Sequence, residues 1–69
     1  MDTKDLNRRF TYHAPKAGQV PRYEAIRAGA LDFALRLNDM CPDSREKSLA
    51  FTSLEQAVMW ANAAIARNE

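Results

Sequence analysis

The chain is 69 residues long, with ten basic and nine acidic residues and a formal net charge of +1. Its 46% of hydrophobic and 28% of charged residues are typical of a small globular domain and exclude a wholly disordered chain. The single cysteine excludes an internal disulfide. With only one cysteine and one histidine, a conventional zinc cluster is also excluded. We therefore expect one domain over residues 1–69 that holds no metal and no cofactor.

The short length favours self-association. A chain of this size buries only about 60% of its surface as a monomer. Without a disulfide or a metal, the remaining sources of stability are close helix packing and oligomerisation. We therefore expect a homo-oligomer. The longest charge-free segment, residues 56–66, is shorter than the ~20 residues that a membrane-spanning helix needs, so we expect no membrane span.

Residues 1–20 predict an extended or irregular arm, because Pro15, Gly18 and Pro21 follow one another closely and interrupt helices. A turn is expected at residues 16–18. Six basic residues stand against three acidic ones in residues 1–27, whereas four stand against six in the remainder. This asymmetry indicates an anionic partner for the N-terminal third, and the alternative is a solvated basic arm.

Residues 21–41 predict a helix that begins at Pro21, since proline is favoured at the first helical position. Pro42 disfavours helical geometry in Cys41 and ends the helix there. The apolar residues recur every three or four positions, which places them on one helix face. They are Tyr23, Ile26, Ala30, Phe33, Leu37 and Met40.

Residues 43–67 predict a second helix, with Asp43 as its N-cap and Glu46 completing a capping box. Its apolar residues follow the same spacing, so that they can pack against the first helix. They are Phe51, Leu54, Val58, Ala61 and Ile65. The short connection makes the pair antiparallel. The predicted fold class is therefore all-α, a two-helix hairpin with an extended N-terminal arm.

The second half of this helix, residues 57–66, is apolar on nearly every side. Such a helix is buried on every side, and one hairpin can cover only one side. We therefore expect contacts between subunits here, with the large Trp60 side chain as an anchor. The alternative is that Trp60 fills a core within one hairpin. The expected interface residues are Val58, Met59, Trp60, Ala61, Ala64 and Ile65.

Binding is better supported than catalysis. His13 is the only histidine, no hydroxyl or thiol has an activating neighbourhood, and the carboxylates are scattered, so we do not expect an enzyme. Residues 8–13 instead interleave cations with aromatic rings, and Lys16 and Arg27 follow. Guanidinium groups bind phosphate and aromatic rings stack on nucleobases, so the pattern predicts a nucleotide site. The alternative is that the rings cover the hairpin core while the cations are solvated.

Arg67 follows the apolar run at the end of the second helix. A cation there interacts favourably with the helix dipole, which is sufficient as a structural explanation. The functional alternative is a cation at an oligomer interface, where symmetry repeats it around a central anion.

Four blocks of this sequence, residues 11–16, 22–27, 41–50 and 54–68, resemble a small bacteriophage family of anti-CBASS sponge proteins, which share a hairpin domain with an anti-Thoeris sponge. The resemblance implies a hexamer of helical hairpins that sequesters cyclic oligonucleotide messengers without degrading them, in the cytoplasm of the infected bacterial host. Two alternatives remain open. One is a sponge for a cyclic ADP-ribose isomer, and the other is a helical oligomerisation module that binds protein or nucleic acid through its basic arm.

The resemblance also implies roles for single residues. In the family a tyrosine stacks on a base and a lysine fifteen positions later contacts phosphate, and Tyr12 and Arg27 have that separation here. An arginine near the end of the second helix contacts cyclic trinucleotide phosphate, and Arg67 matches it. We therefore expect a site for cyclic dinucleotides such as cGAMP at Tyr12, His13, Lys16 and Arg27, and a separate trinucleotide site at Arg67.

Overall fold

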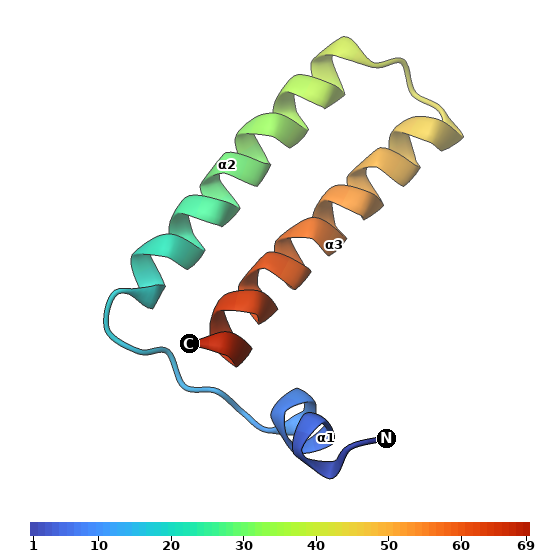
Figure 1. Ribbon diagram of the computed structural model, residues 1–69. Helices are drawn as coiled ribbons and strands as arrows, with labels where there is room; N and C mark the ends of the chain where they lie inside the picture. Colours follow the sequence, from blue (N-terminus) through green and yellow to red (C-terminus); the bar gives the residue numbers. More distant parts are fainter.

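The computed structural model describes all of residues 1–69, in three helices and no strand: α1 (Thr3–Phe10), α2 (Gln19–Met40) and α3 (Arg45–Asn68). Helices α2 and α3 run antiparallel, and α1 lies beyond the open end of this hairpin, near the C-terminus (Figure 1). The molecule is flat, with extents of 45 × 31 × 12 Å. The prediction of an all-α hairpin is confirmed.

The prediction of an extended arm is wrong for residues 3–10, which form α1. Asp2 is the N-cap of this helix, and its side chain accepts a hydrogen bond from the Lys4 backbone N–H at 3.1 Å. Arg8 and Arg9 lie in the last turn, where the helix dipole favours positive charge. Residues that the sequence analysis treated as a basic arm therefore also stabilise a helix.

Helix α2 begins two residues earlier than predicted. Gly18 precedes it in the left-handed conformation, with a φ of 83° that a residue with a side chain rarely adopts. The Gln19 backbone N–H donates to the Lys16 carbonyl at 3.1 Å, which closes the predicted turn. Pro21 is thus the third helical residue instead of the first, where its missing N–H still leaves no helical hydrogen bond unmade.

The N-cap of α3 is Ser44, and the prediction of Asp43 is wrong by one position. The Ser44 hydroxyl accepts a hydrogen bond from the Lys47 backbone N–H at 3.1 Å. Asp43 instead pairs with the Lys47 Nζ at 2.9 Å, and the same ammonium donates to the Asn38 carbonyl of α2 at 3.0 Å. Lys47, with a side chain only 9% exposed, therefore ties the end of α2 to the start of α3.

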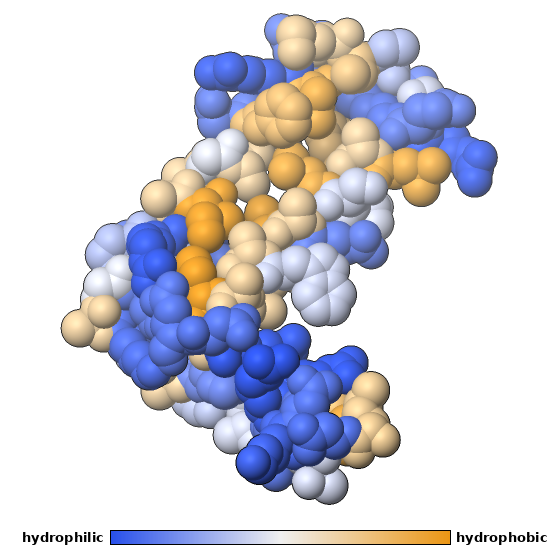
Figure 2. All heavy atoms as spheres, viewed as in Figure 1, coloured by the Kyte–Doolittle hydropathy of each residue, from blue (hydrophilic) through white to orange (hydrophobic).

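The contact between α2 and α3 does not complete a hydrophobic core. No hydrophobic residue is fully buried, and the one buried residue is Gln19. Ile26, Leu54 and Ile65 are half-buried between the helices, whereas Trp60 remains 67% exposed. Figure 2 shows apolar side chains exposed along the length of the hairpin. A single copy of the chain therefore leaves much of its apolar surface in water.

No helix of the structure combines the length and the hydropathy that a membrane span requires.

Candidate ligand-binding groove

A groove of about 450 Å³ lies where the segment after α1 passes the open end of the hairpin. We call it the aromatic–basic groove. Its wall combines side chains from this segment, from the first half of α2 and from the last turns of α3. Those that bear on function are Tyr12, His13, Tyr23, Arg27, Asn62 and Arg67.

The groove brings together most of the residues that the sequence analysis singled out for ligand binding. Tyr12, His13 and Arg27 line it, as the expected dinucleotide site requires. Arg67, which was expected in a separate site, lines the same groove. Lys16 lies outside, where its Nζ donates to the backbone carbonyl of Glu69.

The Tyr12 ring stands free at this groove, with 83% of its surface exposed. Phe10, two residues earlier, is 82% exposed and does not line the groove. Neither ring covers the hairpin core, so that alternative is wrong within one chain. A flat aromatic face in water beside guanidinium groups is suited to stacking on a nucleobase.

The electrostatics of the groove are strongly positive. Arg9, Arg27 and Arg67 line it, and no carboxylate does. Arg9 has a carboxylate partner elsewhere, Asp5 at 3.6 Å, whereas Arg27 and Arg67 form no ion pair. Planar guanidinium groups donate paired hydrogen bonds to phosphate oxygens. The arrangement therefore suits a phosphate-bearing ligand.

His13 is held by a hydrogen bond that fixes its orientation. Its Nε2 lies 2.8 Å from the Arg8 carbonyl oxygen, and because that oxygen can only accept, Nε2 donates. The bond joins the segment after α1 to the end of that helix. The groove contains no carboxylate that could form an acid–base pair with His13.

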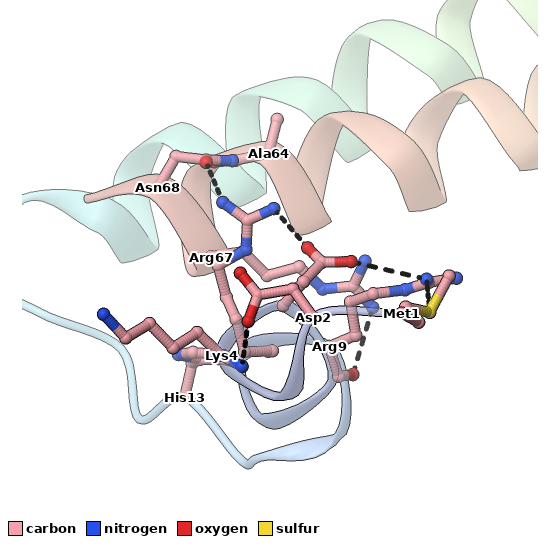
Figure 3. A network of polar contacts seen from close by, with 10 residues as sticks. Met1, Asp2, Lys4, Arg9, His13, Ala64, Arg67 and Asn68 are labelled. Carbon is pink, nitrogen blue, oxygen red and sulfur yellow. Dashed lines mark hydrogen bonds and ion pairs between the residues drawn. The ribbon is translucent and has the colours of Figure 1, made fainter.

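A polar network fastens α1 to the last turn of α3 (Figure 3). Arg8 donates to Asp5 within α1 at 3.0 Å and to the Asn68 side-chain oxygen at 3.3 Å. Arg67 Nη2 donates to the Arg9 carbonyl at 3.5 Å. These contacts keep Arg67 between the two helices and at the edge of the groove.

A second cluster fastens the start of α2 to the end of α3. The Arg22 guanidinium forms a bidentate pair with the Glu69 carboxylate, with Nη1 to Oε2 at 2.8 Å. The hydrogen bond from Arg22 lowers the pKa of the Glu69 carboxyl below its ordinary value, and the same bond raises the pKa of Arg22. Gln19 Nε2 also donates to Glu69 at 3.4 Å.

Two residues of the groove escaped the sequence analysis. Tyr23 was assigned only to the apolar stripe of its helix, yet its side chain also reaches the groove. Asn62 lies inside the apolar run of residues 57–66, which was considered only as an interface. A polar side chain that interrupts such a run is itself a signal, because it must find a polar partner when buried.

The expected interface residues divide into two groups. Met59, Trp60 and Ala64 are exposed, whereas Val58, Ala61 and Ile65 are half-buried. Trp60 therefore does not fill a core within one hairpin. Apolar grooves of about 590 and 320 Å³ also lie along the hairpin, and Val58 and Leu54 line both.

Within the chain, no group of three or more His, Cys, Asp or Glu side chains is arranged to hold a metal ion.

The sequence model of the Acb2/Tad1 hairpin-domain family matches residues 1–66. No curated protein and no solved structure matches the chain. The matched range covers α1, α2 and most of α3, including Asn62. It ends one residue before Arg67.

Proposed function

Because the chain belongs to the Acb2/Tad1 hairpin-domain family, we propose that it binds and sequesters cyclic dinucleotide second messengers, such as cGAMP, without degrading them. Such a protein of a bacteriophage blocks CBASS signalling in the cytoplasm of the infected host. The observation that carries the proposal is the aromatic–basic groove, where the exposed Tyr12 ring stands beside Arg27 and Arg67 with no carboxylate among them.

The chemistry of the ligand matches a groove that symmetry repeats. A cyclic dinucleotide has two bases and two phosphates related by approximate two-fold symmetry, and an isologous interface presents each residue twice. A stacked base contributes ~1–3 kcal/mol and a charged hydrogen bond ~1.5–3 kcal/mol. One copy of Tyr12 and Arg27 falls short of the about −12 kcal/mol of nanomolar binding, and two copies approach it.

The incomplete core supports an assembly that would supply the second copy. The single hairpin leaves Phe33, Met59 and Trp60 at least half exposed. Apolar grooves on the hairpin offer surfaces on which further copies can pack. We propose a homo-oligomer, and specifically the hexamer that the family resemblance implies, with dinucleotide sites between protomers.

The decisive experiment measures binding and then the fate of the ligand. Calorimetric titration with cGAMP should give nanomolar to submicromolar affinity. After proteolysis of the complex, chromatography should recover the dinucleotide intact. Degraded nucleotide, or no binding at micromolar concentrations, would contradict the proposal.

Competition identifies the ligand class. An excess of a cyclic ADP-ribose isomer should not displace cGAMP, and neither should a single-stranded oligonucleotide at physiological salt. Displacement by the cyclic ADP-ribose isomer would favour the anti-Thoeris alternative. Displacement by the oligonucleotide that weakens steeply with salt would favour a nucleic-acid-binding module.

A second ligand is supported by a second groove, of about 440 Å³, which Arg67 also lines. Arg8, Arg9 and the exposed Trp60 line it together with Arg67, and its one carboxylate, Asp5, is paired with Arg8 and Arg9. We propose a cyclic trinucleotide as its ligand, with three copies of Arg67 around a three-fold axis. Arg67→Ala should then abolish trinucleotide binding, measured by calorimetry. Trinucleotide binding that survives this change would contradict the assignment.

A further inference from the structure

Asn62 of the aromatic–basic groove is polar and unpaired. Its Oδ1 is the one buried side-chain oxygen or nitrogen in the chain that has no hydrogen-bond partner. Buried polar atoms in folded proteins are almost always paired, so each exception calls for an explanation. Asn68, on the same helix, shows the usual solution, since its Nδ2 donates to the Ala64 carbonyl at 2.9 Å.

The local sequence is also unfavourable at this position. Asn62 is the only polar residue in residues 57–66, and alanines stand directly before and after it. Asparagine is a poorer helix former than alanine. A buried acceptor without a donor lowers stability further. Residues that break local rules without a structural gain are expected at functional sites.

We propose that Asn62 is the base-reading residue of the aromatic–basic groove, and that its carboxamide recognises the adenine of a bound cyclic nucleotide. This inference rests on the proposed function and deepens it. Tyr12 can hold the face of a base and Arg27 can hold a phosphate, but neither distinguishes one purine from another. A carboxamide offers an acceptor and donors in one plane, which match the N6 amine and N7 of adenine.

The orphaned oxygen is suited to this role because it has no bond to lose. Turning the amide toward a ligand breaks no hydrogen bond of Oδ1 in the free protein. The ligand then supplies the donor that the folded chain lacks. A base without an amine at this point leaves the Asn62 Oδ1 unpaired. The difference in affinity between such a base and adenine should therefore be large.

The test compares two ligands and two variants. Cyclic di-AMP is titrated against its analogue with purine in place of adenine, which lacks the N6 amine. The wild-type protein should bind cyclic di-AMP about ten- to a hundredfold more tightly than the analogue. Asn62→Ala should remove that preference by weakening the binding of cyclic di-AMP much more than that of the analogue, which can make only the N7 contact. Asn38→Ala is the matched control, because it makes the same change in an exposed helical asparagine outside every groove, and it should change neither affinity.

Stability and mass separate this role from a structural one. Asn62→Ala should leave the melting temperature unchanged or raise it, and should leave the oligomer mass in light scattering unchanged. A lower melting temperature or a smaller oligomer would overturn the inference, because Asn62 would then be paired by a neighbouring subunit. Equal weakening of both ligands would overturn it too. If the wild-type protein binds dinucleotides without an amine preference, only the role of Asn62 fails, whereas absence of all cyclic dinucleotide binding removes the proposed function as well.

Discussion

At the scale of single residues, the groove depends on side chains that contribute little to the fold. Tyr12 is 83% exposed, so its removal takes little buried surface from the fold. Arg27 forms no ion pair, so its loss leaves no carboxylate without a partner. Such residues can be replaced with little effect on stability, which makes binding measurements on their variants easy to interpret.

We expect Tyr12→Ala to weaken cGAMP binding by at least about tenfold, because each stacked base contributes ~1–3 kcal/mol. The melting temperature should stay within about 2 °C of the wild-type value, since exposed residues contribute little to stability. Calorimetry and thermal denaturation provide the two measurements. Phe10→Ala is the matched control, because Phe10 is equally exposed but lies outside the groove. Equal losses of affinity in both variants would contradict the assignment.

At the scale of the elements, the helices are held together at their ends by charged contacts. Lys47 joins α2 and α3 at the connection, and Arg22 and Glu69 join them at the open end. Between these points the two helices share only a half-buried apolar seam. The ends of the hairpin should therefore control how firmly the helices are aligned.

Replacing Lys47 by alanine should lower the free energy of unfolding by about 1–2 kcal/mol. It removes the hydrogen bond that the Lys47 side chain, which is 9% exposed, donates to the end of α2, together with an ion pair whose other partner, Asp43, is exposed. Thermal denaturation measures the loss. Arg45→Ala, an exposed basic residue of the same helix with no ion pair, should have no comparable effect. A similar shift for both variants would show that charge alone, and not the contact with α2, is responsible.

The Arg22–Glu69 pair should make stability depend on pH. Because the pKa of Glu69 is lowered in the folded protein, its contribution is present above the unfolded-state value of about 4.3 and is lost as the pH falls through the lowered folded value. Wild type should therefore be more stable than Glu69→Gln at pH 7, and the difference should vanish under more acidic conditions. Glu24→Gln, at an exposed residue without an ion pair, is the control. A difference that persists at pH 2 would contradict this account.

The two long helices were predictable because apolar residues recur every three or four positions from Tyr23 to Met40 and from Phe51 to Ile65. Their ends were not, because single local contacts decide them. For example, Ser44 caps α3 through its hydroxyl, whereas the sequence pattern predicted Asp43. Helix α1 was missed because the prolines after it dominated the interpretation, although Asp2 and the spacing of Asp5 to Arg8 were already helix signals.

The groove was only partly predictable for a similar reason. Tyr12 and Arg27 were identified by the pattern of cations and aromatic rings and then by a family resemblance. Their proximity to Arg67 depends on how α1 and the following segment fold back onto α3, which no periodicity encodes. Asn62 was hidden because it lies in a run that predicts packing and not recognition.

At the scale of the whole molecule, the exposed apolar side chains of α2 and α3 predict assembly into an oligomer. We expect the protein without ligand to be an oligomer, six chains by the family resemblance, in light scattering. Trp60→Glu should yield a smaller species, because it places a charge at the largest exposed apolar side chain of α3. Ser53→Glu adds the same charge to an exposed position of α3 outside every groove and should leave the mass unchanged. A monomeric wild-type protein, or an unchanged mass for Trp60→Glu, would contradict this expectation.

The smallest extent of the molecule, 12 Å, is about the diameter of one helix with its side chains. We therefore expect folding and assembly to be one equilibrium, because a molecule this thin encloses no hydrophobic core of its own. Dilution then acts as a denaturant, and the melting temperature should climb with protein concentration. The total concentration of the chain would then set whether it exists as a folded protein at all.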